Sequence, residues 1–96
     1  MTVKSATGPV SYLRVHKVGT KYGPPQDQLD AEVIVKLKNV SGAYGFQLRA
    51  DSNQAVGEAM VALLSDAFNA NKAVTLEYEE RPGKSNQPVL RVIRTT

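Results

Sequence analysis

Hydrophobic and polar residues along this chain follow two periods, and the clearer of them is helical. After residue 51 the apolar side chains recur at i, i+4, i+7, i+8, i+11 and i+12, which places them on one face of a helix. They are Val56, Met60, Leu63, Leu64, Ala67 and Phe68. Because a helix with one apolar face must bury it against another layer, we expect this face to pack on a sheet.

Both ends of this helix carry sequence signals. Asp51 or Ser52 can accept the free N–H groups of the first turn, and Asp51 lies three residues before Gln54, as in a capping box. The helix is therefore expected to begin at about Ser52. Residues 69–72 indicate its end, because an Asn there can adopt the left-handed conformation. Gly57 weakens the helix interior, and close packing on a neighbouring element would explain its presence.

The rest of the chain has the period of two that is typical of strands. In the longest alternating segment, Ile34 and the lysines that follow it are expected to point outward, opposite Val33 and Val35. A polar turn at residues 39–42 predicts a hairpin between the second and third strands. The predicted strands cover residues 10–18, 29–38, 44–48, 74–79 and 89–93.

Three segments show neither period. Residues 1–9 are expected to form a flexible lead-in, so that a single domain covers residues 10–96. Residues 19–28 are dense in Gly, Pro and polar residues, and prolines supply no N–H to a strand ladder, so we expect an exposed loop. Residues 81–88 are predicted to form a polar turn between the last two strands.

The order of elements is strand, strand, strand, helix, strand, strand. In a chain of 96 residues this order predicts a β-rich α+β fold, a five-stranded OB-like Greek-key barrel with one helix between strands three and four. A plain α+β sandwich is the alternative.

Composition restricts the class of protein further. The chain has 42% hydrophobic and 22% charged residues, which is typical of a globular domain, and it has no cysteine for a disulfide or a thiolate site. Its net charge of +3 allows an anionic partner without requiring one. No apolar run approaches the ~20 residues of a membrane span, so none is expected. The expected compartment is the cytoplasm if Met1 is the native start, and the exterior if a signal peptide has been removed.

No catalytic motif stands out, so we expect neither an enzyme, nor a metal, nor another cofactor. His16 is the only histidine and is interpreted as a strand-surface residue. The acidic residues Glu77, Glu79 and Glu80 are interpreted as surface charges rather than a glycosidase pair. The glycine-flanked residues 42–45 open a strand instead of a helix, which favours a tight turn over a phosphate-binding loop.

OB-folds bind oligonucleotides and oligosaccharides across strands two and three, with the adjoining loops as walls. Basic and aromatic residues at those positions are the candidate ligand-binding set. The alternation of Tyr44 with Phe46 and Leu48 also favours a core position for Tyr44. The candidates are Tyr22, Lys36, Lys38, Tyr44, Arg49, Arg81 and Lys84.

The segment from Phe46 to Arg94 resembles the C-terminal half of the B subunits of pentameric bacterial toxins of the cholera, pertussis and subtilase types. The likeness lies in the order of a strand ending near Leu48, a polar cap, a helix containing Met60 and Ala67-Phe68, the strand Lys72-Ala73-Val74-Thr75-Leu76-Glu77-Tyr78, and a closing strand. It covers about half of the chain. The resemblance implies a closed homo-oligomer, with a pentamer as the first expectation, a glycan ligand and a separate catalytic subunit.

The final strand suggests how such a ring would close. Leu90 and Val92 are expected on one side and the other three residues of 89–93 on the other, so that both faces are partly apolar. An exposed apolar edge strand is expected to pair with another subunit. The expected interface residues are Val89, Arg91, Val92 and Ile93.

Three functional hypotheses remain open from the sequence. The first is a non-enzymatic homo-oligomeric binding module that recognises a glycan or another small polar ligand through residues 19–28. The second is a single-stranded nucleic-acid-binding OB domain that uses Lys36, Lys38 and Arg49. The third is a structural oligomer without a small ligand.

Overall fold

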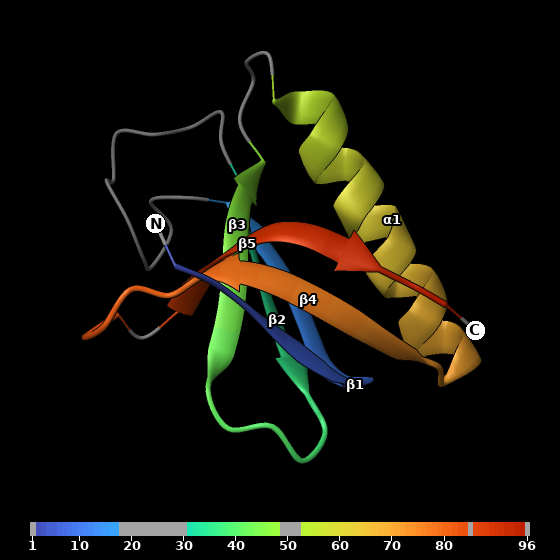
Figure 1. Cartoon of the computed structure of the whole chain (residues 1–96). Helices are drawn as coiled ribbons and strands as arrows, with labels where there is room; N and C mark the ends of the chain where they lie inside the picture. The colour runs from blue at the N-terminus through green and yellow to red at the C-terminus, as the bar shows by residue number, and fades with distance from the viewer. Residues whose placement is uncertain (1, 18–30, 49–52, 85, 96) are drawn as a thin grey trace.

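Five strands and one helix follow one another in the predicted order (Figure 1). This computed structural model describes residues 2–17, 31–48, 53–84 and 86–95. The elements are β1 (Val3–Lys17), β2 (Ala31–Leu37), β3 (Ala43–Leu48), α1 (Gln54–Ala70), β4 (Ala73–Glu79) and β5 (Asn86–Ile93). The predicted loop at residues 19–28 lies outside the described residues.

The strands form a closed ring in the order β1, β2, β3, β5, β4, after which β4 pairs with β1 again. All neighbours are antiparallel except β3 and β5, which run parallel. The predicted hairpin of β2 and β3 is present, and Gly42 in its turn has a φ of 90°, a conformation that favours glycine. A mostly β fold with one helix between strands three and four is therefore confirmed.

β1 serves two neighbours, because it changes partner in its middle. Its first part pairs with β4, and its second part pairs with β2 from Val10 onward. Gly8 and Pro9 form the corner: a Cβ on Gly8 would lie 3.1 Å from the Lys38 carbonyl oxygen, and the Pro9 carbonyl accepts the Lys38 N–H at 2.9 Å. The expectation of a flexible lead-in at residues 1–9 is therefore wrong, since the strand already begins at Val3.

The helix begins two residues later than expected and ends as expected. Asn53 occupies the N-cap position without a side-chain capping bond, while the predicted caps, Asp51 and Ser52, lie outside the described residues. At the other end, Asn71 adopts the left-handed conformation, with φ of 56°. The Lys72 N–H then donates to the Ala67 carbonyl at 2.9 Å, as in a Schellman motif.

The helix covers the ring with a narrower face than its sequence pattern suggests. Leu64 and Ala67 are fully buried, and they join the core cluster with residues of every strand. Val56 and Phe68, by contrast, are 55% and 42% exposed, so the prediction that they help to cover the ring is wrong. Both lie near the ends of α1, where its apolar stripe extends past the core.

Gly57 brings the helix close to β3. A Cβ at this position would lie 2.6 Å from Cδ2 of Leu48, which is closer than Cβ atoms approach their neighbours in real proteins. The close packing that the sequence suggested for this glycine is confirmed.

β5 contains a bulge that changes its two faces. Tyr78 pairs with Val89 and Glu77 pairs with Arg91, so Leu90 is an extra residue between two paired positions. The bulge places Leu90 on the outside, where it is exposed. Simple alternation, which grouped Leu90 with Val92, is therefore wrong.

The bulge also weakens the expected interface. Val89 is buried within its own chain, Val92 packs partly against the core, and Arg91 pairs with Glu77. β5 is not a free edge at its start, because Asn86, Gln87 and Pro88 pair with β3 there. Only the part from Val89 to Ile93 has β4 as its sole paired neighbour.

Leu64→Ala should lower the free energy of unfolding by about 2–5 kcal/mol, because it leaves a cavity in a fully buried site. Val56→Ala is the matched control: it also truncates an aliphatic side chain of α1, but at an exposed position, and should change stability by less than about 0.5 kcal/mol. Urea unfolding of the three proteins gives both values. Equal and small effects would contradict the packing of α1 described above.

Candidate functional site

An open groove of about 660 Å³ crosses the outer surface of β2, β3 and the start of β5. Its floor is one row of cross-strand neighbours, in which Ile34 pairs with Gly45 and Gly45 pairs with Pro88. Ile34 points away from the ring interior, as its alternation with Val33 and Val35 predicts. The floor is therefore apolar and comes from three strands that are distant in sequence.

Gly45 is required by the tight packing of this floor. A Cβ there would lie 2.9 Å from the Val33 carbonyl oxygen and 3.1 Å from Cδ1 of Ile34, with Cβ of Asn86 at 3.8 Å. Any other residue would have to displace backbone or fill the groove. The flat floor thus depends on a glycine at the centre of the row.

The turn between β4 and β5 contributes two cations to the groove lining, Arg81 and Lys84. The Lys84 N–H donates to the Arg81 carbonyl at 3.2 Å, and Gly83 has a φ of 83°. With Pro82 before that glycine, the geometry is that of a type II turn. The Pro-Gly pair therefore determines how the chain reverses beside the groove.

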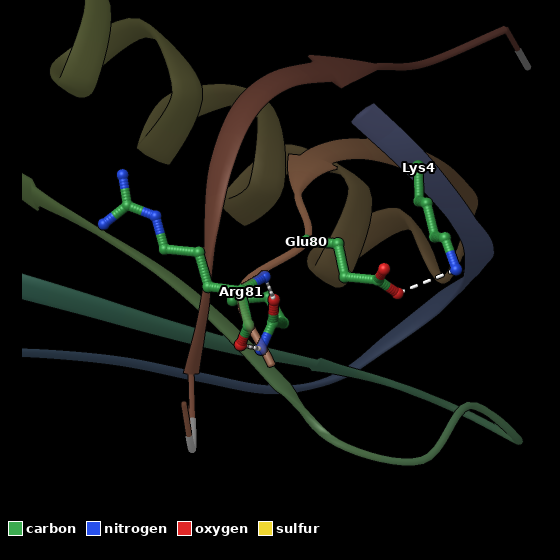
Figure 2. Close-up of polar contacts among 4 residues, drawn as sticks. Lys4, Glu80 and Arg81 are labelled. Atoms are coloured by element: carbon green, nitrogen blue, oxygen red, sulfur yellow. Dashed lines mark hydrogen bonds and ion pairs between the residues drawn. The ribbon is translucent and has the colours of Figure 1, made fainter. Parts of the chain in front are cut away.

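Gln87 holds this turn in place through three hydrogen bonds. Its Oε1 accepts the Arg81 N–H at 2.6 Å, and its Nε2 donates to the carbonyl oxygens of Arg81 at 3.0 Å and Lys84 at 3.2 Å. One side chain thus satisfies three backbone groups of a turn that would otherwise depend on water. Figure 2 shows the Arg81 side chain extending away from the nearby Lys4–Glu80 pair.

Ion pairs beside the turn tie its base to the ring. Nζ of Lys4 lies 2.7 Å from Oε2 of Glu80, and the Glu80 N–H donates to the Thr2 carbonyl at 2.8 Å. The hydrogen bond and the charge of Glu80 raise the pKa of Lys4. Arg81 pairs with Glu79 at 2.9 Å, so part of its charge is already neutralised.

The remaining lining is polar apart from Phe46, which also packs against the core. Glu32 and Gln47 form the next cross-strand pair beside the floor, and Oε1 of Glu32 lies 3.5 Å from Nε2 of His16. Asn53, at the start of α1, and Asn86 add two amides. Amides both donate and accept hydrogen bonds, so the groove offers both kinds of partner above an apolar floor.

The structure separates the seven predicted ligand-binding residues into four groups, the last of which is Tyr44 alone. Arg81 and Lys84 line the groove. Lys36, in β2, and Lys38, in the turn after it, are exposed but do not line the groove. Tyr22 and Arg49 lie outside the described residues.

The structure contradicts the prediction that Tyr44, the seventh candidate, binds a ligand. Tyr44 is 5% exposed, and its ring centroid lies 4.9 Å from that of Tyr78 within the core. Burial first, and the neighbouring Tyr78 second, raise the pKa of Tyr44. A residue in this position contributes to stability and cannot contact a ligand in the groove.

Several groove residues were not among the predicted candidates. The outward position of Ile34 was readable from alternation, but its place on the floor depends on the pairing of β3 with β5. Gln87 and Asn53 carry no local signal, because their roles depend on contacts made by the folded turn and helix. Of the residues described, no three His, Cys, Asp or Glu side chains are grouped closely enough to hold a metal ion.

Two further findings concern the whole chain. It matches no model of a known protein family, and no curated protein is similar to it at a significant level. Within the described ranges, no helix has the length and apolar character needed to cross a membrane.

The burial of Tyr44 predicts an alkaline loss of stability. The fold raises the pKa of Tyr44. The contribution of its protonated hydroxyl to the free energy of unfolding is therefore complete below the ordinary tyrosine pKa of about 10, and it is lost as the pH rises through the higher pKa of the folded state. Tyr44→Phe cannot ionise, so its melting temperature should fall less steeply between about pH 9.5 and 11. Identical curves for the wild type and Tyr44→Phe would contradict the assignment.

Proposed function

We propose that this protein is a non-enzymatic OB-type binding module that takes a small polar ligand, such as an oligosaccharide, into the groove beside the β4–β5 turn. The observation that carries the proposal is the position of the groove, over β2 and β3 and beside the turn that joins β4 to β5. OB-folds bind oligosaccharides and oligonucleotides at this place. The strand order and the helix between β3 and β4 support a Greek-key OB barrel as the fold.

The chemistry of the groove suits a ligand rich in hydroxyl groups. Gln47, Asn53 and Asn86 supply amide donors and acceptors, and Ile34 and Pro88 offer an apolar surface to the less polar face of a sugar ring. Among the described residues, one carboxylate, Glu32, lines the groove, whereas glycoside hydrolysis in most families uses two. This supports binding without cleavage. The loop at residues 19–28, expected to bind the ligand, lies outside the described residues, so the proposal rests on the groove.

Assembly is the second part of the proposal. We infer from the resemblance to toxin B subunits that the chain forms a closed homo-oligomer, most simply a pentamer, with a separate catalytic subunit as a further partner. Beyond Pro88, β5 leaves β3 and pairs only with β4, so one of its edges is available for another chain. Exposed Leu90 and partly buried Ile93 lie along that segment and make it the expected interface.

Single-stranded nucleic acid is the alternative ligand, and one observation favours it. Lys36, near the end of β2, and Lys38, in the turn after it, are both exposed and lie close in sequence to the groove residue Ile34. Binding to single strands would weaken with salt, by a log–log slope of about −0.7 for each phosphate contacted. Neutral oligosaccharides should respond little to salt, so the salt dependence separates the two ligands.

The groove is tested with a panel of neutral and acidic oligosaccharides. Gln47→Ala and Asn86→Ala should each weaken the best-binding saccharide by about three- to tenfold, because each removes a groove amide. Asn69→Ala removes an exposed amide of α1 outside the groove and should leave affinity unchanged. Titration calorimetry measures all four proteins. Unchanged affinity in both groove variants would place the binding site elsewhere.

Sedimentation equilibrium at micromolar concentration tests the assembly. We expect a mass of several chains, with five as the first expectation, and Ile93→Asp should shift it toward a single chain because it places a charge at the expected interface. Val56→Asp introduces the same charge on the exposed part of α1 and should leave the mass unchanged. A wild-type mass of one chain would exclude the ring.

A further inference from the structure

Two lysines at the end of β2 lie beside the groove. Lys36 is exposed on the outward face that β2 shares with the groove residue Ile34, and Lys38 is exposed in the turn directly after β2. Two neighbouring ammonium groups suit repeated anionic groups rather than a single anion. We refer to Lys36 and Lys38 as the lysine track.

The cations of this protein differ in whether a carboxylate neutralises them. Lys4, Arg81, Arg91 and Arg94 each pair with an acidic side chain. Lys36, Lys38 and Lys84 form no ion pair with any residue that the structure describes. Among the described residues, positive charge without a carboxylate partner therefore lies at the end of β2 and, through Lys84, within the groove itself.

Tyr12 orients one residue of the lysine track, Lys36. Nζ of Lys36 lies 5.1 Å from the centroid of the Tyr12 ring, and the Arg14 guanidinium carbon lies over the same ring at 5.9 Å. Nη1 of Arg14 also donates to the Tyr12 hydroxyl at 3.3 Å. A cation–π contact orients a cation without cancelling its charge, unlike a carboxylate. Tyr12 thus holds Lys36 in position while its charge stays available to a ligand.

The same contacts argue against stacked bases. Sequence-tolerant binding of single strands uses aromatic rings with open faces. Tyr12 has cations over its ring, Tyr44 is buried, and Phe46 and Tyr78 pack against the core. The described part of this surface thus offers positive charge and amides, which match charged groups and hydroxyls better than bases.

We propose that the lysine track and Lys84 bind the anionic groups of a polyanionic oligosaccharide, one with repeated sulfate or carboxylate groups, whose sugar rings lie in the groove. The proposal rests on the proposed function and names its ligand class. The amides of Gln47 and Asn86 take the hydroxyl groups, and the lysine track takes the charges that extend beyond the groove along β2. Both parts of the surface are needed, because the groove alone provides one unpaired cation among its described lining residues.

The test uses a heparin-derived hexasaccharide, its desulfated counterpart and an oligothymidylate of equal charge, titrated between 50 and 200 mM salt. The sulfated saccharide should bind most tightly. Lys36→Gln combined with Lys38→Gln should weaken it about tenfold and flatten its log–log salt slope by about 1.5, since each cation in contact with a polyanion releases roughly one counterion. Both sites are exposed, and circular dichroism melting verifies that the variant folds.

A charge-matched control removes two cations that already have carboxylate partners. Lys4→Gln combined with Arg91→Gln lowers the net charge equally, and because exposed ion pairs contribute little to stability it should fold normally. Its affinity should stay within about twofold of wild type, because it leaves the lysine track intact. An equal loss in this control would show that only net charge matters and would overturn the proposal.

Tyr12 supplies a test of the positioning role. Tyr12→Leu should weaken the sulfated saccharide several-fold, whereas Tyr12→Phe, which retains the ring, should restore most of the affinity. Equal affinities for the two variants would contradict that role. Tighter binding of the oligothymidylate would overturn the saccharide class in favour of nucleic acid. Equal binding of the desulfated saccharide would contradict the role of the lysine track and leave the proposed role of the groove intact. If no saccharide binds, both proposals are wrong.

Discussion

The short parallel pairing of β3 with β5 is the constraint on which the rest of this structure depends. Only Ala43–Gly45 and Asn86–Pro88 take part, yet this contact closes the ring and brings the last strand beside the third. Because β5 begins directly after the β4–β5 turn, the same contact places that turn beside the surface of β2 and β3. The same strand pairing therefore closes the ring and forms the groove, and a change that separates β3 from β5 would remove both.

The residues at this junction combine structural and site-forming roles. Gly45 allows the strands to approach closely enough to pair, and its missing side chain keeps the groove floor flat. Gln87, paired with Tyr44 in the same junction, uses its side chain to hold the turn that carries Arg81 and Lys84. Tyr44 faces inward from the same row and anchors the junction in the core. The geometry of the groove is thus supported by a junction that Tyr44 anchors in the core.

Sequence reasoning succeeded where the physical cause is local. The alternation in β2, the hairpin that follows it and the left-handed Asn71 at the helix end all depend on neighbouring residues, and all were predicted. It failed where the cause is a distant partner. Gly8-Pro9 looked like a loose segment, but it is the corner at which β1 exchanges β4 for β2, a role that only the partner strands define. The bulge at Leu90 likewise exists only relative to β4.

In the candidate site, too, the features with a local cause were predicted and those that depend on distant contacts were not. Arg81 and Lys84 could be named from their position in a predicted turn, whereas the contribution of Gln87 required the folded turn to be seen. The charges show a further regularity. The arginines after the helix, Arg81, Arg91 and Arg94, each pair with a carboxylate, for which a planar guanidinium is well suited. Lysine is a strongly hydrated point charge and gains less from such pairs. Lys36, Lys38, Lys72 and Lys84 are exposed and have no carboxylate partner among the described residues. Lys72 lies just after the end of α1, whereas Lys84 lines the groove and Lys36 and Lys38 follow the groove residue Ile34 along the chain, so three of these four charges lie at or beside the candidate site.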